Sequence, residues 1–205
     1  MDEHGEGRGQ QRRSGQIAEA LVRVAGRRGL RAVGMRDVAA EAGVSLRLGQ
    51  YYFQTKENLL MYGLEHLAAG LGARVAERLR AVGQNPGPRA MIEALLMESL
   101  PTDEVSRTFH IVYTSYAALA LTDEALAALP FIDNPNAAED ALTALLQQAV
   151  GAKPAPPDTD PRTEAISLLA MSAGLGTSIL VGQRTQESAA SVLRHHLDRL
   201  FPALR

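Results

Sequence analysis

Apolar residues recur along most of this chain at intervals of three and four positions, which is the period of an amphipathic helix. Between Ser14 and Arg28 they fall at Ile17, Leu21 and Val24, so one side of the segment is apolar. The pattern predicts a helix here, with Ser14 as its N-cap and the apolar side in a core.

The same period indicates that the rest of the chain is helical. Ala and Leu are plentiful and only 4% of the residues are aromatic, which favours helices over a sheet. The predicted helices cover residues 35–42, 45–53, 55–82, 89–99, 102–116, 122–129, 134–150, 162–181 and 187–200. The predicted fold class is therefore all-α.

Glycines interrupt the longest of these helices. Gly63, Gly70 and Gly72 lie within the pattern that runs from Thr55 to Val82. They allow either close packing against neighbouring helices or flexibility in an element that joins two domains. The sequence leaves both interpretations open.

Two segments have the composition of irregular chain. Residues 1–12 are rich in Gly, Gln and charge, and we expect a disordered arm there. Arg8, Arg12 and Arg13 in this arm are suited to touching phosphates or the minor groove, and a merely solvated tail is an equally good interpretation. Residues 151–161 are rich in Pro and Asp and predict a loop.

The stretch from Met35 to Leu60 carries the most informative pattern. Val38 and Ala42 share one helical face, and Gly43 follows them where a left-handed residue can end a helix. Ser45 is then a good N-cap for a second short helix. A helix, a glycine turn and another helix form the helix-turn-helix pattern, whose second helix lies in the DNA major groove.

The second short helix carries residue types that suit DNA recognition. Gln50 can offer a bidentate amide to adenine, and Arg47 can reach guanine or a phosphate. Side chains of the kind that contacts phosphate lie at Ser45, Tyr51, Tyr52 and Lys56. The alternative is that these are ordinary polar groups on two small helices and that the tyrosines only pack.

Short motifs over about the first sixty residues combine into a family resemblance. They lie at Gly29–Leu30, Met35–Ala39, Ala42–Ser45, Tyr51–Phe53 and Thr55–Leu60. Together they resemble the N-terminal domain of the TetR family of transcriptional regulators. The resemblance implies a dimeric, all-α repressor with an N-terminal three-helix helix-turn-helix domain at residues 13–60. A long helix would join it to a larger helical domain at residues 61–205, which would bind a small effector and form the dimer.

Three positions depart from the family pattern. Gly34 stands where Ser or Thr usually caps the second helix, so that cap is weaker here. Gln50 stands where many members have a phosphate-contacting Tyr, and Tyr52 replaces a frequent His. By analogy with the family, Arg36 contacts phosphate rather than Asp37 and solvent. The candidate DNA-contacting residues are Arg36, Ser45, Leu46, Arg47, Gln50, Tyr51, Tyr52 and Lys56.

The charge distribution agrees with a DNA-binding N-terminal part. The chain as a whole has a net charge of −2. From Arg8 to Lys56, however, ten Lys and Arg stand against three acids, whereas eleven stand against sixteen beyond Asn58. A basic end on an acidic chain fits attraction to phosphate confined to that end. For one basic group we favour a solvated helix face over a DNA contact: Arg23, Arg27, Arg28 and Arg31.

The C-terminal part offers candidates for a ligand pocket and a dimer face. Apolar and polar side chains suited to line a pocket lie at Phe109, His110, Tyr113, Tyr116 and Met171, although core packing is the stronger interpretation. The segment 162–181 is apolar nearly all round and carries a stripe of small residues. We expect it to be buried against its symmetry mate, so that the last two helices form a homodimer.

Composition excludes several other classes of protein. The chain has no cysteine, which excludes disulfides and thiolate metal sites. We find no signal core and no run that is long and apolar enough to span a bilayer, so we expect no membrane contact and a cytoplasmic location. Neither paired catalytic carboxylates, a metal cluster nor a phosphate loop is evident, and we predict no catalytic residue, metal or cofactor.

Together these features predict a ligand-responsive transcriptional regulator, in the first place a repressor. It would bind a palindromic operator in double-stranded DNA as a homodimer and be released by an unknown small molecule. One alternative is a helical protein-interaction module without sequence-specific DNA binding. An all-helical enzyme is the less favoured alternative.

Overall fold

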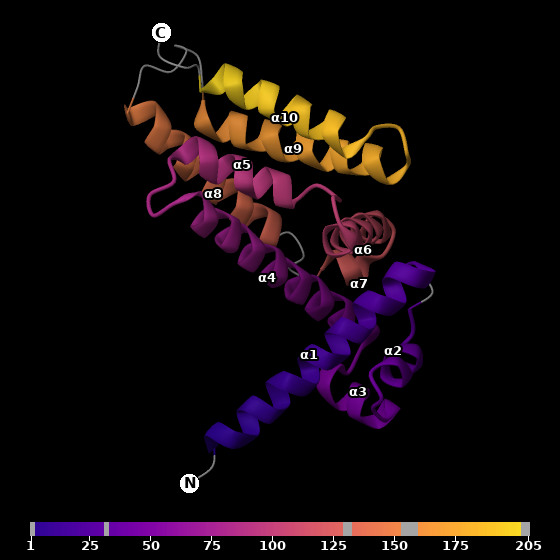
Figure 1. Cartoon of the computed structure of the whole chain (residues 1–205). Helices are drawn as coiled ribbons and strands as arrows, with labels where there is room; N and C mark the ends of the chain where they lie inside the picture. The colour runs from indigo at the N-terminus through magenta and orange to yellow at the C-terminus, as the bar shows by residue number, and fades with distance from the viewer. Residues whose placement is uncertain (1–2, 31–32, 129–132, 153–159, 202–205) are drawn as a thin grey trace. The chain divides into compact units, whose positions relative to one another are not determined.

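The computed structural model describes residues 3–30, 33–128, 133–152 and 160–201 (Figure 1). Over these ranges the chain forms ten α-helices and no strand, which confirms the all-α fold class. The helices are α1 (Glu3–Arg28), α2 (Met35–Glu41), α3 (Leu46–Phe53), α4 (Lys56–Val82), α5 (Pro88–Glu98), α6 (Glu104–Ala120), α7 (Glu124–Ala127), α8 (Asp133–Ala152), α9 (Pro161–Leu180) and α10 (Gln186–Leu200).

The chain divides into two compact units. The N-terminal unit comprises residues 1–69 and 111–131, and the C-terminal unit comprises residues 70–110 and 132–205. Helices α4 and α6 each begin in one unit and end in the other. This division differs from a boundary after residue 60, because an apolar period shows that a side chain is buried but not which helix covers it.

The core of the N-terminal unit is built on the apolar face of α1. Ile17 and Leu21 are fully buried, as are Leu59 and Leu60 of α4. Gly63 of α4 is also buried and faces Leu21. The spacing of apolar residues along α1 therefore predicts its buried face correctly.

Helix α1 begins earlier than the sequence suggests. It runs from Glu3, so residues 3–12 are helical and the expectation of a disordered arm is wrong for them. Gln, Glu and Arg are good helix formers, and the glycines between them do not outweigh this. Ser14 consequently lies inside the helix and is not its N-cap. Its hydroxyl instead accepts a 2.9 Å hydrogen bond from Tyr62 of α4.

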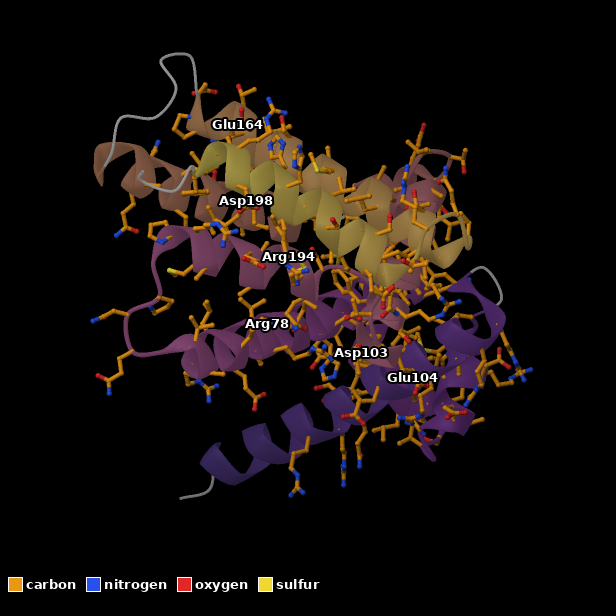
Figure 2. All side chains as sticks on the ribbon, turned by 45° about the horizontal axis from the view of Figure 1, so that its top comes forward. Arg78, Asp103, Glu104, Glu164, Arg194 and Asp198 are labelled. Atoms are coloured by element: carbon orange, nitrogen blue, oxygen red, sulfur yellow. The ribbon has the colours of Figure 1, made fainter. Side chains whose placement is uncertain are left out.

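The C-terminal unit packs α5, α8, α9 and α10 around one apolar cluster. Fully buried side chains from these helices meet there: Ile92, Leu96, Leu142, Leu168, Leu193 and Leu197. Ion pairs on the surface connect α5 with α10. Arg89 donates to Asp198 at 2.6 Å and Arg194 donates to Glu93 at 3.0 Å, with both α10 residues labelled in Figure 2.

Helix α9 is exposed along one side within the chain. It is long and apolar enough to cross a membrane by length and composition alone, contrary to the expectation from the sequence, although a core helix passes the same test. Only 28% of its apolar window is buried inside the chain. Its exposed side carries Ile166, Ala170, Ala173 and Thr177. Burial all round, which the sequence predicts, is therefore not achieved within one chain.

Candidate nucleic-acid interface

The turn between α2 and α3 is formed by Gly43 and Ser45. Gly43 has a φ of +67°, in the left-handed region that favours glycine, and follows the end of α2. The hydroxyl of Ser45 accepts a 3.2 Å hydrogen bond from the backbone N–H of Leu48 and so caps α3. The N-cap of α2, Gly34, makes no side-chain hydrogen bond. These local features agree with the pattern in the sequence.

The two sides of α3 differ in exposure. Gly49 and Phe53 are buried, and Gly49 lies 3.5 Å or more from Met35 and Ala39 of α2 when a Cβ is added to it. Arg47, Gln50 and Tyr51 are exposed and share one helical face, since they are spaced by three and four residues.

Tyr51 is the most exposed residue of that face. Its side chain is 73% exposed, so packing does not account for its position. Tyr52 is half-buried, and its ring centroid lies 5.5 Å from that of Tyr51 and 6.3 Å from that of Phe53. Leu46 is half-buried as well. Tyr52 and Leu46 therefore present only part of their surface beside the exposed face.

The turn from α3 to α4 contains a feature that the sequence does not indicate. Gln54 has φ +59° and ψ −54°, a conformation rare for a residue with a side chain. The N–H of Thr55 donates to the carbonyl of Phe53 at 2.5 Å across this turn. Thr55 then caps α4 by accepting from Asn58 N–H at 3.1 Å, and Lys56 is half-buried in the first turn behind it.

The basic residues of the N-terminal unit fall into two groups. Arg23 and Arg27 of α1 both donate to Glu41 at the end of α2, with distances of 2.9 and 2.5 Å. Their hydrogen bonds hold the pKa of Glu41 below its usual range. Arg28 donates to Asp37 at 3.2 Å. These three arginines connect α1 with α2 rather than forming only a solvated face, and Arg31 lies outside the described residues.

Arg36 and Arg47 form the second group. Both are exposed, and neither makes a salt bridge within the parts of the chain that the structure describes. Asp37, the alternative partner of Arg36, is engaged by Arg28. Arg36 and Arg47 therefore keep their charge available for another molecule, whereas the α1 arginines do not.

The five candidate pocket residues do not share one environment. Phe109, His110 and Met171 belong to the C-terminal unit, whereas Tyr113 and Tyr116 belong to the N-terminal unit. Tyr116 is fully buried and its hydroxyl donates to the carbonyl of Leu126 at 3.3 Å, which identifies it as a core residue.

His110 is also largely enclosed. It is 5% exposed, its Nε2 lies 3.5 Å from the Thr177 hydroxyl, and a Cβ on Gly176 would lie 2.1 Å from its Cε1. Burial lowers the pKa of His110. A neutral histidine packed against the glycine of α9 agrees with the interpretation as core. Phe109, Tyr113 and Met171 are half-buried.

Comparison with known families accounts for both parts of the chain. Residues 17–62 match the family described as bacterial regulatory proteins, tetR family, and residues 88–202 match the BetI-type transcriptional repressor, C-terminal. The second match covers more than half of the chain. The chain belongs to the TetR family of transcriptional regulators. TetR-family members are non-enzymatic DNA-binding proteins with a ligand-binding domain.

Individual proteins of the family are similar at moderate identity. The transcriptional regulator PksA of Bacillus subtilis is 30% identical over 111 residues, which are 54% of this chain and 52% of PksA. The chain thus spans about half the length of the first curated relatives it matches. A TetR-family regulator from Rhodococcus sp. has the same fold, with a TM-score of 0.82, 23% identity and coverage of 92% of this chain and 97% of that one.

A third similar protein is a transcriptional regulator from Saccharomonospora viridis whose structure was solved in complex with choline. It has a TM-score of 0.73 and 23% identity, and the alignment covers 89% of this chain and 92% of that one. At this identity, the likeness shows the fold alone.

Proposed function

We propose that this TetR-family protein is a repressor that binds a palindromic operator as a homodimer and is released by a small molecule. The observation that carries the proposal is the face formed by Arg47, Gln50 and Tyr51 on α3. This face is exposed, on the second helix of a helix-turn-helix whose other side is buried. The match to a BetI-type repressor supports repression rather than activation.

The residues of this face divide by chemistry into base and phosphate contacts. Gln50 is suited to adenine and Arg47 to guanine, because an amide and a guanidinium each match two groups on those base edges. The hydroxyls of Ser45, Tyr51 and Tyr52, with Arg36 and Lys56, are suited to phosphates. Leu46, which is half-buried, would make an apolar contact at the edge of the groove.

The exposed side of α9 supports dimerisation through α9 and α10. An apolar helix side with small residues allows another helix to approach closely, and a second copy related by a two-fold axis would cover the same side on both chains. Two recognition helices related in this way would read half-sites about 34 Å apart. We propose the cytoplasm as the site of action.

The effector would bind within the ligand-binding domain. Phe109 and Met171 are half-buried apolar residues of the C-terminal unit and are the candidates that the structure favours most, since Tyr116 and His110 have core contacts. Tyr113 remains a candidate beside them. The complex of a similar regulator with choline supports a small organic effector for this chain, without identifying it. Release of DNA requires that the effector binds the two states of the protein with different affinity.

Selection of bound fragments from a genomic DNA library tests the function. The full chain should enrich a palindromic motif, and light scattering should show a dimer. Tyr51→Ala should weaken binding to the enriched fragment while the variant stays folded. Failure of the library to enrich any motif would contradict the proposal and favour the helical interaction module.

A further inference from the structure

The three glycines of α4 have different surroundings. A Cβ on Gly63 would lie 2.1 Å from Leu21 Cδ2, so close packing requires a glycine there. Around Gly70 and Gly72 a Cβ would meet nothing within 4 Å, and both residues are exposed. Packing therefore explains Gly63 but gives no reason for Gly70 or Gly72.

Gly70 and Gly72 lie where α4 passes from one unit to the other. The N-terminal unit ends its first segment at Ala69, and Gly70 is the first residue of the C-terminal unit. Buried residues of α4 extend only to Leu67, and every residue from 68 to 82 is half-buried or exposed. The glycines thus follow directly on the part of α4 that is held in the N-terminal core.

Beyond the glycines, ion pairs hold α4 within the C-terminal unit. Arg74 donates to Glu98 at 2.7 Å and to Asp103 at 2.5 Å, and Arg78 donates to Glu98 at 2.8 Å. Glu98 is only 4% exposed, and Asp103 caps α6 by accepting from Ser106 N–H at 2.9 Å. Figure 2 labels Arg78 on α4 and Asp103 at the start of α6. Since these anchors are buried or engaged in capping, the second half of α4 is tied to α5 and α6.

We propose that α4 is a hinge at Gly70–Gly72, between a first half fixed by apolar packing and a second half fixed by Arg74 and Arg78. Glycine weakens a helix interior relative to alanine by about fivefold in the opening equilibrium for each residue. Helix α6 also passes between the units, but Glu104–Ala120 contains neither Gly nor Pro. Bending is therefore concentrated in α4. Its use in releasing DNA rests on the proposed function, whereas the hinge itself does not.

Hydrogen exchange followed by mass spectrometry on the full chain tests the hinge. Amides of residues 70–76 should be protected at least tenfold less than those of residues 60–67. In the double variant Gly70→Ala, Gly72→Ala this protection should rise by about twentyfold. Gly15→Ala is the matched control, because a Cβ at position 15 of α1 also meets nothing within 4 Å. It should leave α4 unchanged.

A distance measurement gives an independent result. The chain has no cysteine, so Glu65→Cys and Arg80→Cys can carry spin labels on exposed positions of α4. The labels would stand about 22 Å apart along a straight helix. Labelled chain is diluted with unlabelled chain, so that only pairs within one chain are seen. The wild-type background should give a broad distance distribution, and the double alanine variant a narrow one.

The outcomes separate the hinge from the proposed function. Protection at residues 70–76 equal to that of residues 60–67, or the same distance distribution with and without the glycines, overturns the hinge. If the wild-type chain binds no DNA, the proposed function fails, and the exchange result still decides the hinge. If DNA is bound, the double variant should show a change in operator affinity that Gly15→Ala lacks.

Discussion

Gly63 of α4 lies so close to Leu21 of α1 that an added Cβ would stand 2.1 Å from Leu21 Cδ2. Leu21 is fully buried and has no free space into which to move. This contact fixes α1 against α4 in the N-terminal unit. A glycine that the sequence presents only as an interruption of a helix is therefore part of the core.

Gly63→Ala should destabilise the protein for this reason. Forcing Leu21 out of its position costs about 1–3 kcal/mol, although the gain in helix propensity offsets up to about 1 kcal/mol of it. Urea unfolding measures the difference. Gly15→Ala, which has open space around it, should not lower stability. Equal stability of Gly63→Ala and the wild type would contradict the packing described here.

Gln54→Gly should stabilise the protein. Gln54 holds φ +59° at the turn into α4, and glycine adopts such a conformation without a steric penalty. The relief of strain should raise the free energy of unfolding by about 1 kcal/mol. Gln50→Gly is the matched control, since it places glycine inside α3 and should lower stability. A loss of stability on Gln54→Gly, measured by thermal unfolding, would show that the backbone at position 54 is not strained.

Arg36→Ala and Arg28→Ala should separate DNA contact from structure. Arg36 has no described salt bridge, whereas Arg28 is paired with Asp37. If Arg36 contacts phosphate, its loss should weaken binding to all sequences alike and reduce the slope of log K against log salt by about 1. Arg28→Ala should leave that slope unchanged. Equal slopes for Arg36→Ala and the wild type would remove Arg36 from the interface.

Asp103→Asn should flatten the acid dependence of stability. The hydrogen bond from Arg74 and the backbone N–H of Ser106 lower the pKa of Asp103 to about 2. A carboxyl whose pKa is lower in the folded state stabilises the fold above its unfolded pKa near 4, and loses this effect as the pH falls towards 2. Asn keeps an acceptor for the cap of α6 but does not titrate.

Wild type should therefore lose more stability than Asp103→Asn between pH 4 and pH 2. Urea unfolding at several pH values gives the two curves, and their difference isolates Asp103 from other acids. Parallel curves would mean that the ion pair with Arg74 does not persist in solution.

Local features of the fold follow from the sequence because their causes are local. Gly43, Ser45 and Thr55 act through backbone conformation and a hydroxyl three residues from its donor, and all three hold the predicted places. The period of apolar residues likewise predicts the buried face of α1. Helix propensity alone places the start of that helix at Glu3, where composition had suggested an arm.

Features that join distant segments were not predictable from the sequence. The pairs of Arg23 and Arg27 with Glu41 depend on how α1 meets α2, and a period in one helix does not indicate its partner. The same holds for Tyr116, whose burial and bond to Leu126 place it in the core rather than in a pocket. The strain at Gln54 has no signal in residue type.

The central claim is that the exposed face of α3 reads bases. Fluorescence anisotropy with the enriched operator fragment and with random DNA, on wild type and Gln50→Ala, measures it most directly. Removal of a bidentate base contact costs about 1–3 kcal/mol, so Gln50→Ala should bind the operator about 5- to 150-fold more weakly and random DNA equally well. Equal affinity of both proteins for the operator would contradict the account.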